Sequence, residues 1–140
     1  MNRRVVLVIY NLLLPFALLL SLPAHVFKML RRGGYGRGFW ERFASYSKEK
    51  AGALRRLDAP VWIHAVSVGE VNVAKKLLGA LRELEPGLPV VISTTTPTGH
   101  VIAEASDASA VIYNPIDFRP VARRALRFVQ PRALVLVEAE

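Results

Sequence analysis

The sequence predicts an α/β fold in which a parallel sheet is covered by helices on both faces, preceded by an N-terminal membrane-anchor helix. Short apolar runs alternate with helical patterns from residue 60 onward. The links between them are short, as in strand–helix–strand units. Before them, Val5 to Phe27 contains no Asp, Glu, Lys or Arg. The chain is therefore divided into an anchor helix (1–27), a basic connector (28–58) and an α/β domain (59–140).

The uncharged segment is long enough for a membrane anchor. As a straight helix it would extend ~34 Å, against a hydrocarbon core of ~30 Å. A cleaved signal peptide ending near "LPA" is an alternative, but a strongly basic stretch would make a poor mature N-terminus. A buried core helix is another, but such a helix is rarely apolar on all sides. We expect an anchor that either spans the membrane or lies in its interface.

Positive charge is concentrated in the N-terminal third of the chain. Residues 1–56 contain 11 Lys and Arg and 2 acidic residues, whereas residues 57–140 contain 8 and 9. Two basic residues precede the apolar segment and five follow it within residues 28–42. This excess after the segment predicts that the rest of the chain faces the cytoplasm. Charge beside an apolar segment favours a membrane surface over DNA, so we expect no nucleic-acid partner. The aromatic, Arg-rich connector predicts a short helix near 39–50. We expect the connector to lie at the membrane interface, to bind an anionic lipid head group, or to do both.

The α/β domain is predicted to contain four strands and three helices. The strands are short apolar runs rich in β-branched residues, at 60–68, 90–96, 109–116 and 131–140. The helices have apolar residues at helical spacing or begin near a Pro, at 69–84, 97–106 and 118–129. Strands that are apolar throughout are typical of a sheet covered on both faces. The sequence stops within the fourth strand, so we interpret it as a fragment with one sheet edge exposed.

Polar residues lie at the ends of all four predicted strands, at the edge where ligands of such sheets bind. They are Ser67, Gly69 and Glu70 after the first strand, Thr94, Thr95, Thr96, Pro97, Thr98 and Gly99 after the second, Asn114, Pro115 and Asp117 after the third, and Glu138 and Glu140 on the fourth. The chain has no Cys and its three His are scattered, so we expect neither thiolate chemistry nor a metal site.

Each group also has a simpler interpretation. Glu70 at the start of a helix complements the helix dipole, an effect of some tenths of a kcal/mol, roughly. The stretch "TTTPTG" either caps a helix or binds an anion, and it lacks the Gly-Lys-Ser/Thr pattern of a P-loop. Two carboxylates ending an apolar strand are costly to bury without donors, which a ligand, a loop or further chain would supply.

In combination, "HAVSVGE", "TTTPTG" and "PRALVLVEAE" resemble the N-terminal domain of the bacterial Kdo (3-deoxy-D-manno-octulosonic acid) transferases. The resemblance covers about residues 30–140, and the preceding anchor also matches. It implies a Rossmann-like acceptor-binding domain, the N-terminal half of a two-domain GT-B glycosyltransferase. Such an enzyme transfers Kdo from CMP-Kdo to lipid A precursor at the cytoplasmic face of the inner membrane, and it is inverting and needs no metal or other cofactor.

The resemblance also implies roles for individual residues. Glu70 matches the general base that deprotonates the acceptor hydroxyl, and Glu138 and Glu140 match an E-x-E motif. The serine and glycine before Glu70, the "TTTPTG" loop and the two glutamates of the E-x-E motif are expected to bind the acceptor. The C-terminal donor-binding domain is missing, so we expect the fragment to be inactive alone. The alternatives are a non-catalytic, membrane-anchored domain that binds an anionic lipid or sugar, and a generic nucleotide binder, which the absence of G-x-G-x-x-G disfavours.

Overall fold

The computed structural model describes residues 7–17, 19–20 and 38–138. Its four strands are parallel and form one sheet in the order β3-β2-β1-β4. The strands are β1 (Val61–Ala65), β2 (Val90–Thr94), β3 (Ala110–Tyr113) and β4 (Ala133–Val137). The helices are the 3₁₀ helix η1 (Trp40–Phe43) and α2 (Lys48–Arg55), α3 (Val68–Leu84), α4 (Pro97–Glu104) and α5 (Arg119–Val129). The predicted parallel α/β sheet is confirmed, and it is consistent with a Rossmann-like domain.

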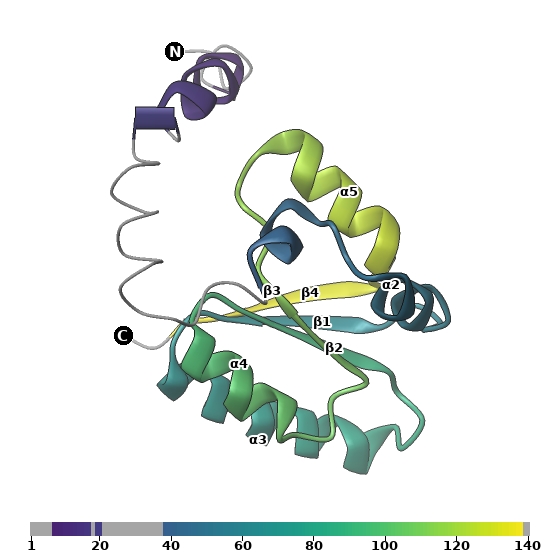
Figure 1. Cartoon of the computed structure of the whole chain (residues 1–140). Coiled ribbons are helices and arrows are strands. Elements are labelled where there is room, and N and C mark those ends of the chain that lie inside the picture. The colour runs from purple at the N-terminus through teal and green to yellow at the C-terminus, as the bar shows by residue number, and fades with distance from the viewer. Residues whose placement is uncertain (1–6, 18, 21–37, 139–140) are drawn as a thin grey trace.

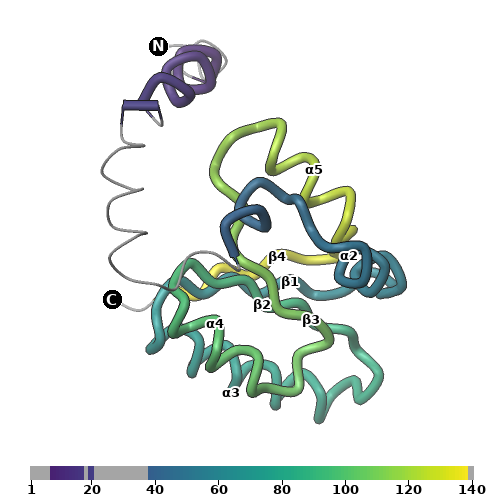
Figure 2. Tube along the Cα trace, viewed as in Figure 1, coloured from purple at the N-terminus to yellow at the C-terminus, as the bar shows by residue number. Residues whose placement is uncertain are grey.

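Helices cover both faces of the sheet, as predicted (Figure 1). Side chains along β1 alternate between two cores, as the two-residue period of a strand requires. Val61, Ile63 and Ala65 pack in the core beneath α3 and α4, and Trp62 packs in the core beneath α2 and α5. The chain from η1 to α2 lies on the same side of the sheet as α5 (Figure 2). The domain therefore has three layers, with β1 and β2 at the centre.

The connector differs from the prediction of one helix near 39–50. The structure has η1 followed by α2, which begins at Lys48 and ends at Arg55. Ala44, at φ 53°, ends η1 in the left-handed conformation, and the side chain of Ser47 then accepts the backbone N–H of Lys50 and caps α2. Gly38 leaves no room for a Cβ against the ring of Tyr113, so the connector packs closely on β3.

The fourth strand is shorter and more exposed than predicted. It ends at Val137, and Leu134 and Leu136 are 53% and 60% exposed. This agrees with the expectation of one exposed sheet edge, because β4 is an edge strand that pairs only with β1 in the described residues.

Residues 7–17 and 19–20 are helical, and most of their apolar side chains are exposed. The hydroxyl of Tyr10 donates to the carboxylate of Asp117, and Asn11 Oδ1 accepts the backbone N–H of Arg119. None of the helices in the described residues combines the length and the apolar character that a membrane crossing requires. Much of the predicted anchor, including residues 21–27, lies outside the described residues, so the anchor stays a prediction.

Candidate functional site

Glu70 lies in the first turn of α3, directly beyond the carboxyl end of β1. Its Oε2 accepts the backbone N–H of Val66 at 2.6 Å and that of Ser67 at 3.4 Å. Its Oε1 accepts the hydroxyl of Ser67 at 3.0 Å, and Ser67 Oγ in turn accepts the backbone N–H of Glu70. This is a capping box, in which the two side chains satisfy the free donors at the helix start. The predicted position of Glu70 at a helix start is confirmed, and its structural role there is in the capping box.

The same bonds favour the ionised form of Glu70. They lower its pKa below the ordinary value, chiefly through the backbone N–H of Val66, so the carboxylate is charged at neutral pH. A carboxylate has about four acceptor positions, and the bonds within the described residues use three of them. Oε1 accepts one bond and keeps room for a second. Glu70 is thus a fixed, ionised and half-exposed carboxylate that can accept a ligand hydroxyl.

His64 is a neighbour of Glu70 that the sequence motifs did not single out. Burial lowers the pKa of His64 below its ordinary value, while hydrogen bonding to Ser93 and the charge of Glu70 oppose that shift. Its Nδ1 lies 3.0 Å from Ser93 Oγ, which also accepts the indole N–H of Trp62 at 2.8 Å. The imidazole is therefore held in a fixed orientation near the carboxylate. His64 is the first residue of the "HAVSVGE" motif and a polar residue inside an otherwise apolar strand, but neither signal assigned it a role.

The predicted loop from Thr94 to Gly99 joins β2 to α4. Thr96 caps the helix by accepting the backbone N–H of Gly99 at 3.1 Å, and Pro97 takes the first helical position. A Cβ on Gly99 would lie 2.7 Å from Oγ1 of Thr94 and 2.8 Å from that of Thr96. Only glycine fits there without displacing a threonine. Thr94 and Gly99 are buried, so they shape the loop, whereas the residues between them reach the surface and Thr98 is exposed.

The connector holds this loop from the side. Arg42 Nη2 donates to the carbonyl of Thr95 at 2.7 Å, and its guanidinium lies 4.8 Å from the ring centre of Tyr113. Glu41 accepts the backbone N–H of Tyr113 and pairs with Lys50 at 2.6 Å. The bond from Arg42 to Thr95 joins residues 53 positions apart, and the bond between Glu41 and Tyr113 joins residues 72 positions apart. No local pattern in the sequence could have identified them.

The strand register aligns the carboxyl ends of β1, β2 and β4, where the predicted site segments begin. Ala65 pairs with Thr94 on one side and with Val137 on the other. The residues that follow these three, including Thr95 and Glu138, therefore begin side by side. Gly69 is exposed in the first turn of α3, and Glu138 is exposed just beyond β4. Glu140 lies outside the described residues.

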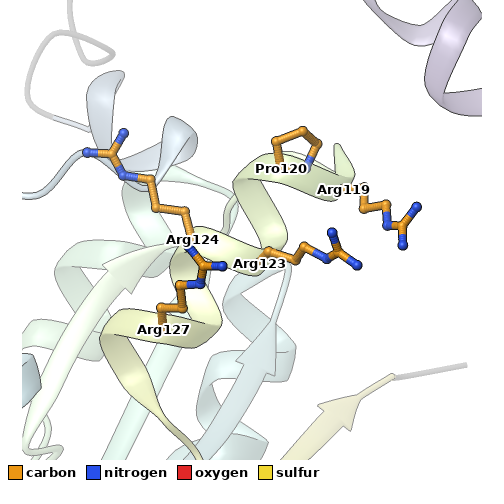
Figure 3. A pocket seen from close by; sticks show the side chains of 5 residues that line it. All are labelled: Arg119, Pro120, Arg123, Arg124 and Arg127. Carbon is orange, nitrogen blue, oxygen red and sulfur yellow. The ribbon is translucent and has the colours of Figure 1, made fainter.

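No three His, Asp or Glu side chains of the described ranges are grouped closely enough to hold a metal ion. A separate basic surface is formed by α5. Its four arginines line a shallow surface depression (Figure 3).

Comparison with known proteins gives a consistent family. Residues 37–140 match the sequence model of a family described as 3-deoxy-D-manno-octulosonic-acid transferase (kdotransferase). A 3-deoxy-D-manno-octulosonic acid transferase of Bordetella pertussis is 40% identical over 121 residues, which cover 80% of this chain and 28% of that protein. The transferase of the same name from Haemophilus influenzae is 37% identical over 82 residues, 57% of this chain and 19% of its own length. No solved structure matches the chain.

The matched region begins in the connector and includes the capping box of Glu70, the Thr94–Gly99 loop and β4. The chain spans less than a third of the length of these curated relatives. The family model matches most of the chain, and the Bordetella pertussis relative is 40% identical over 80% of it, so the chain belongs to the 3-deoxy-D-manno-octulosonic-acid (Kdo) transferase family.

Proposed function

We propose that this chain is the acceptor-side part of an inverting glycosyltransferase that moves Kdo from CMP-Kdo to lipid A precursor in lipopolysaccharide biosynthesis. The family match supports the reaction class. The observation that carries the assignment to this domain is the Glu70 carboxylate, which is ionised, fixed by three hydrogen bonds and half-exposed at the ligand-binding edge of the sheet.

In the proposed step, Glu70 accepts the proton of the acceptor hydroxyl while the hydroxyl oxygen attacks the anomeric carbon of Kdo. The new carbon–oxygen bond forms as the bond to the phosphate of CMP breaks, and CMP leaves with the electron pair. A positioned base typically contributes a factor of about 10²–10⁴ to such a transfer. The capping box suits this task because it fixes the carboxylate before the acceptor arrives. We propose that no metal or other cofactor takes part.

The acceptor is proposed to lie across the edge between Glu70, the Thr95–Thr98 surface and Glu138. The hydroxyl and backbone N–H groups at the start of α4 suit a sugar or phosphate group. The donor is proposed to bind a C-terminal domain that lies outside these 140 residues, so transfer requires both parts. We further propose that residues 1–27 anchor the chain at the cytoplasmic face of the bacterial inner membrane and that the basic connector lies against its anionic head groups.

The proposal is tested by Glu70→Gln in a two-domain form, in which this chain is joined to a family donor domain. Kdo transfer should fall by a factor of about 10² or more, because an amide cannot accept the proton. CMP-Kdo binding should persist. Glu83→Gln, an exposed position on the same helix, is the matched control and should leave transfer unchanged. Near-normal turnover of the Glu70 variant would refute the base assignment.

A second function is favoured by the capping box itself. Because both oxygens of Glu70 are already engaged, the residue is fully accounted for by helix capping. The chain would then be a non-catalytic domain that binds an anionic lipid or sugar. In that case the two-domain form would still bind the acceptor, and Glu70→Gln would not change whatever transfer is measured.

The anchor is tested separately by deleting residues 1–27 and measuring the membrane-bound fraction, which should fall.

A further inference from the structure

The outer face of α5 carries only positive charge. Arg119, Arg123 and Arg127 are spaced four residues apart, so they form one stripe along the helix, and Arg124 lies beside it. All four are exposed, and Figure 3 shows their side chains extending from the helix. The opposite face packs into the core through Ala125 and Val129. The stripe is therefore a surface held in place by a well-packed helix.

These arginines have no acidic partner among the residues that the structure describes. The ion pairs found there lie elsewhere, and α5 itself contains no Asp or Glu. By contrast, α3 on the other side of the sheet mixes acidic and basic residues. Like charges four residues apart weaken an isolated helix, so a stripe of this kind fits an external anion better than plain solvation.

An exposed apolar segment lies next to the stripe. The helical residues 7–17 and 19–20 expose large apolar side chains, including Leu12, Phe16 and Leu20 at 63% or more. Asn11 accepts the first backbone N–H of α5, and Tyr10 bonds to Asp117 just before it. Leu126 is 46% exposed within the arginine stripe. Cationic and apolar surfaces are thus joined at the start of α5.

We propose that the arginine face of α5 is a second membrane-contact surface, which rests on the phosphates of anionic lipids. A lipid surface matches both parts of the feature, because its head groups pair with arginine and its acyl layer accepts apolar side chains. A nucleic acid would match only the charge. The α2–α5 layer then faces the lipid, and the α3–α4 layer faces away. This inference rests on the proposed membrane location and adds an orientation to it.

The chain contains no Cys, so single engineered thiols can report that orientation. Leu126→Cys places a thiol on the arginine face, and Ala80→Cys places one on the exposed side of α3 as the matched control. The full chain is mixed with vesicles of phosphatidylcholine, with or without phosphatidylglycerol, and a water-soluble maleimide is added. The thiol at position 126 should react several-fold more slowly when phosphatidylglycerol is present. The thiol at position 80 should react at the same rate with both kinds of vesicle.

Charge removal supplies the second arm. Each arginine near an anionic surface contributes about a fivefold factor in affinity. Arg123→Gln with Arg127→Gln, in the Leu126→Cys background, should therefore abolish most of the protection while thermal unfolding is unchanged. Equal rates at position 126 in both vesicle types would overturn the proposal, as would equal protection at position 80. Equal protection of position 126 by a DNA oligonucleotide without lipid would assign the face to nucleic acid instead. These readouts do not depend on Glu70, so their failure leaves the transfer assay unaffected.

Discussion

Gly99→Ala measures how tightly the Thr94–Gly99 loop is packed at the candidate site. The new Cβ would lie 2.7 Å from Oγ1 of Thr94 and 2.8 Å from Oγ1 of Thr96. Thr94 is fully buried, and threonine is stiff at χ1, so its hydroxyl cannot move away freely. Overpacking of this kind costs ~1–3 kcal/mol. Weakening the Thr96 cap adds ~1 kcal/mol, and the better helix propensity of Ala offsets ~1 kcal/mol.

The expected net result is a loss of ~1–3 kcal/mol in the free energy of unfolding, measured by urea denaturation. Gly79→Ala is the matched control, because Gly79 lies inside α3 and a Cβ there meets nothing within 4 Å. That variant should gain ~0.5–1 kcal/mol. If Gly99→Ala were as stable as the parent while Gly79→Ala gained stability, the close packing of the loop would be refuted.

Three further outcomes follow from the contacts. Arg42→Ala should raise KM for the acceptor in the two-domain form more than it lowers kcat, because the Thr95 carbonyl loses its donor. Arg55→Ala, at an exposed position of α2, is the control, and equal effects of the two variants would contradict the role of Arg42 in holding the Thr94–Gly99 loop. Ser67→Ala should lower the free energy of unfolding by ~1 kcal/mol and raise the pKa of Glu70, because the carboxylate loses a donor. NMR titration of the Glu70 carboxyl group measures the pKa, and an unchanged titration would contradict the role of Ser67 in the capping box. Burial lowers the pKa of His100 from 6.5, so the stability that its neutral form contributes is present above that pH and is lost as the pH falls. Thermal unfolding measured against pH should show this loss, and His100→Phe should make the loss smaller. An identical pH dependence in the parent and the variant would exclude His100 as its source.

Local patterns predicted the elements well but the buried face of α3 less well. Val73 and Leu84 belong to the apolar periodicity of that segment, yet they are 48% and 84% exposed. The buried residues are Val71, Ala74 and Leu78. The helix begins at Val68, and a small Ala is what fits closest to the sheet. A count of large apolar residues therefore overestimates what the core holds.

The candidate site, too, could be predicted only in part from the sequence. That Glu70 lies at a helix start beside the sheet edge could be predicted, because a strand, a Gly and a Glu follow one another in the sequence. Its bond to the backbone of Val66 and the contact of Arg42 with the Thr95 carbonyl could not. Both depend on how the chain turns in three dimensions. Strand order was equally out of reach, because alternation of strands and helices does not say which strand is central.

The central claim is that Glu70 takes the proton of the acceptor hydroxyl. Its most direct test is the single-turnover rate of Kdo transfer by Glu70→Ala in the two-domain form, with and without added formate. The rate should fall by a factor of about 10²–10⁴, and formate should partly restore it because the small carboxylate occupies the space of the missing base. A variant that transfers Kdo at nearly the parental rate without formate would contradict it.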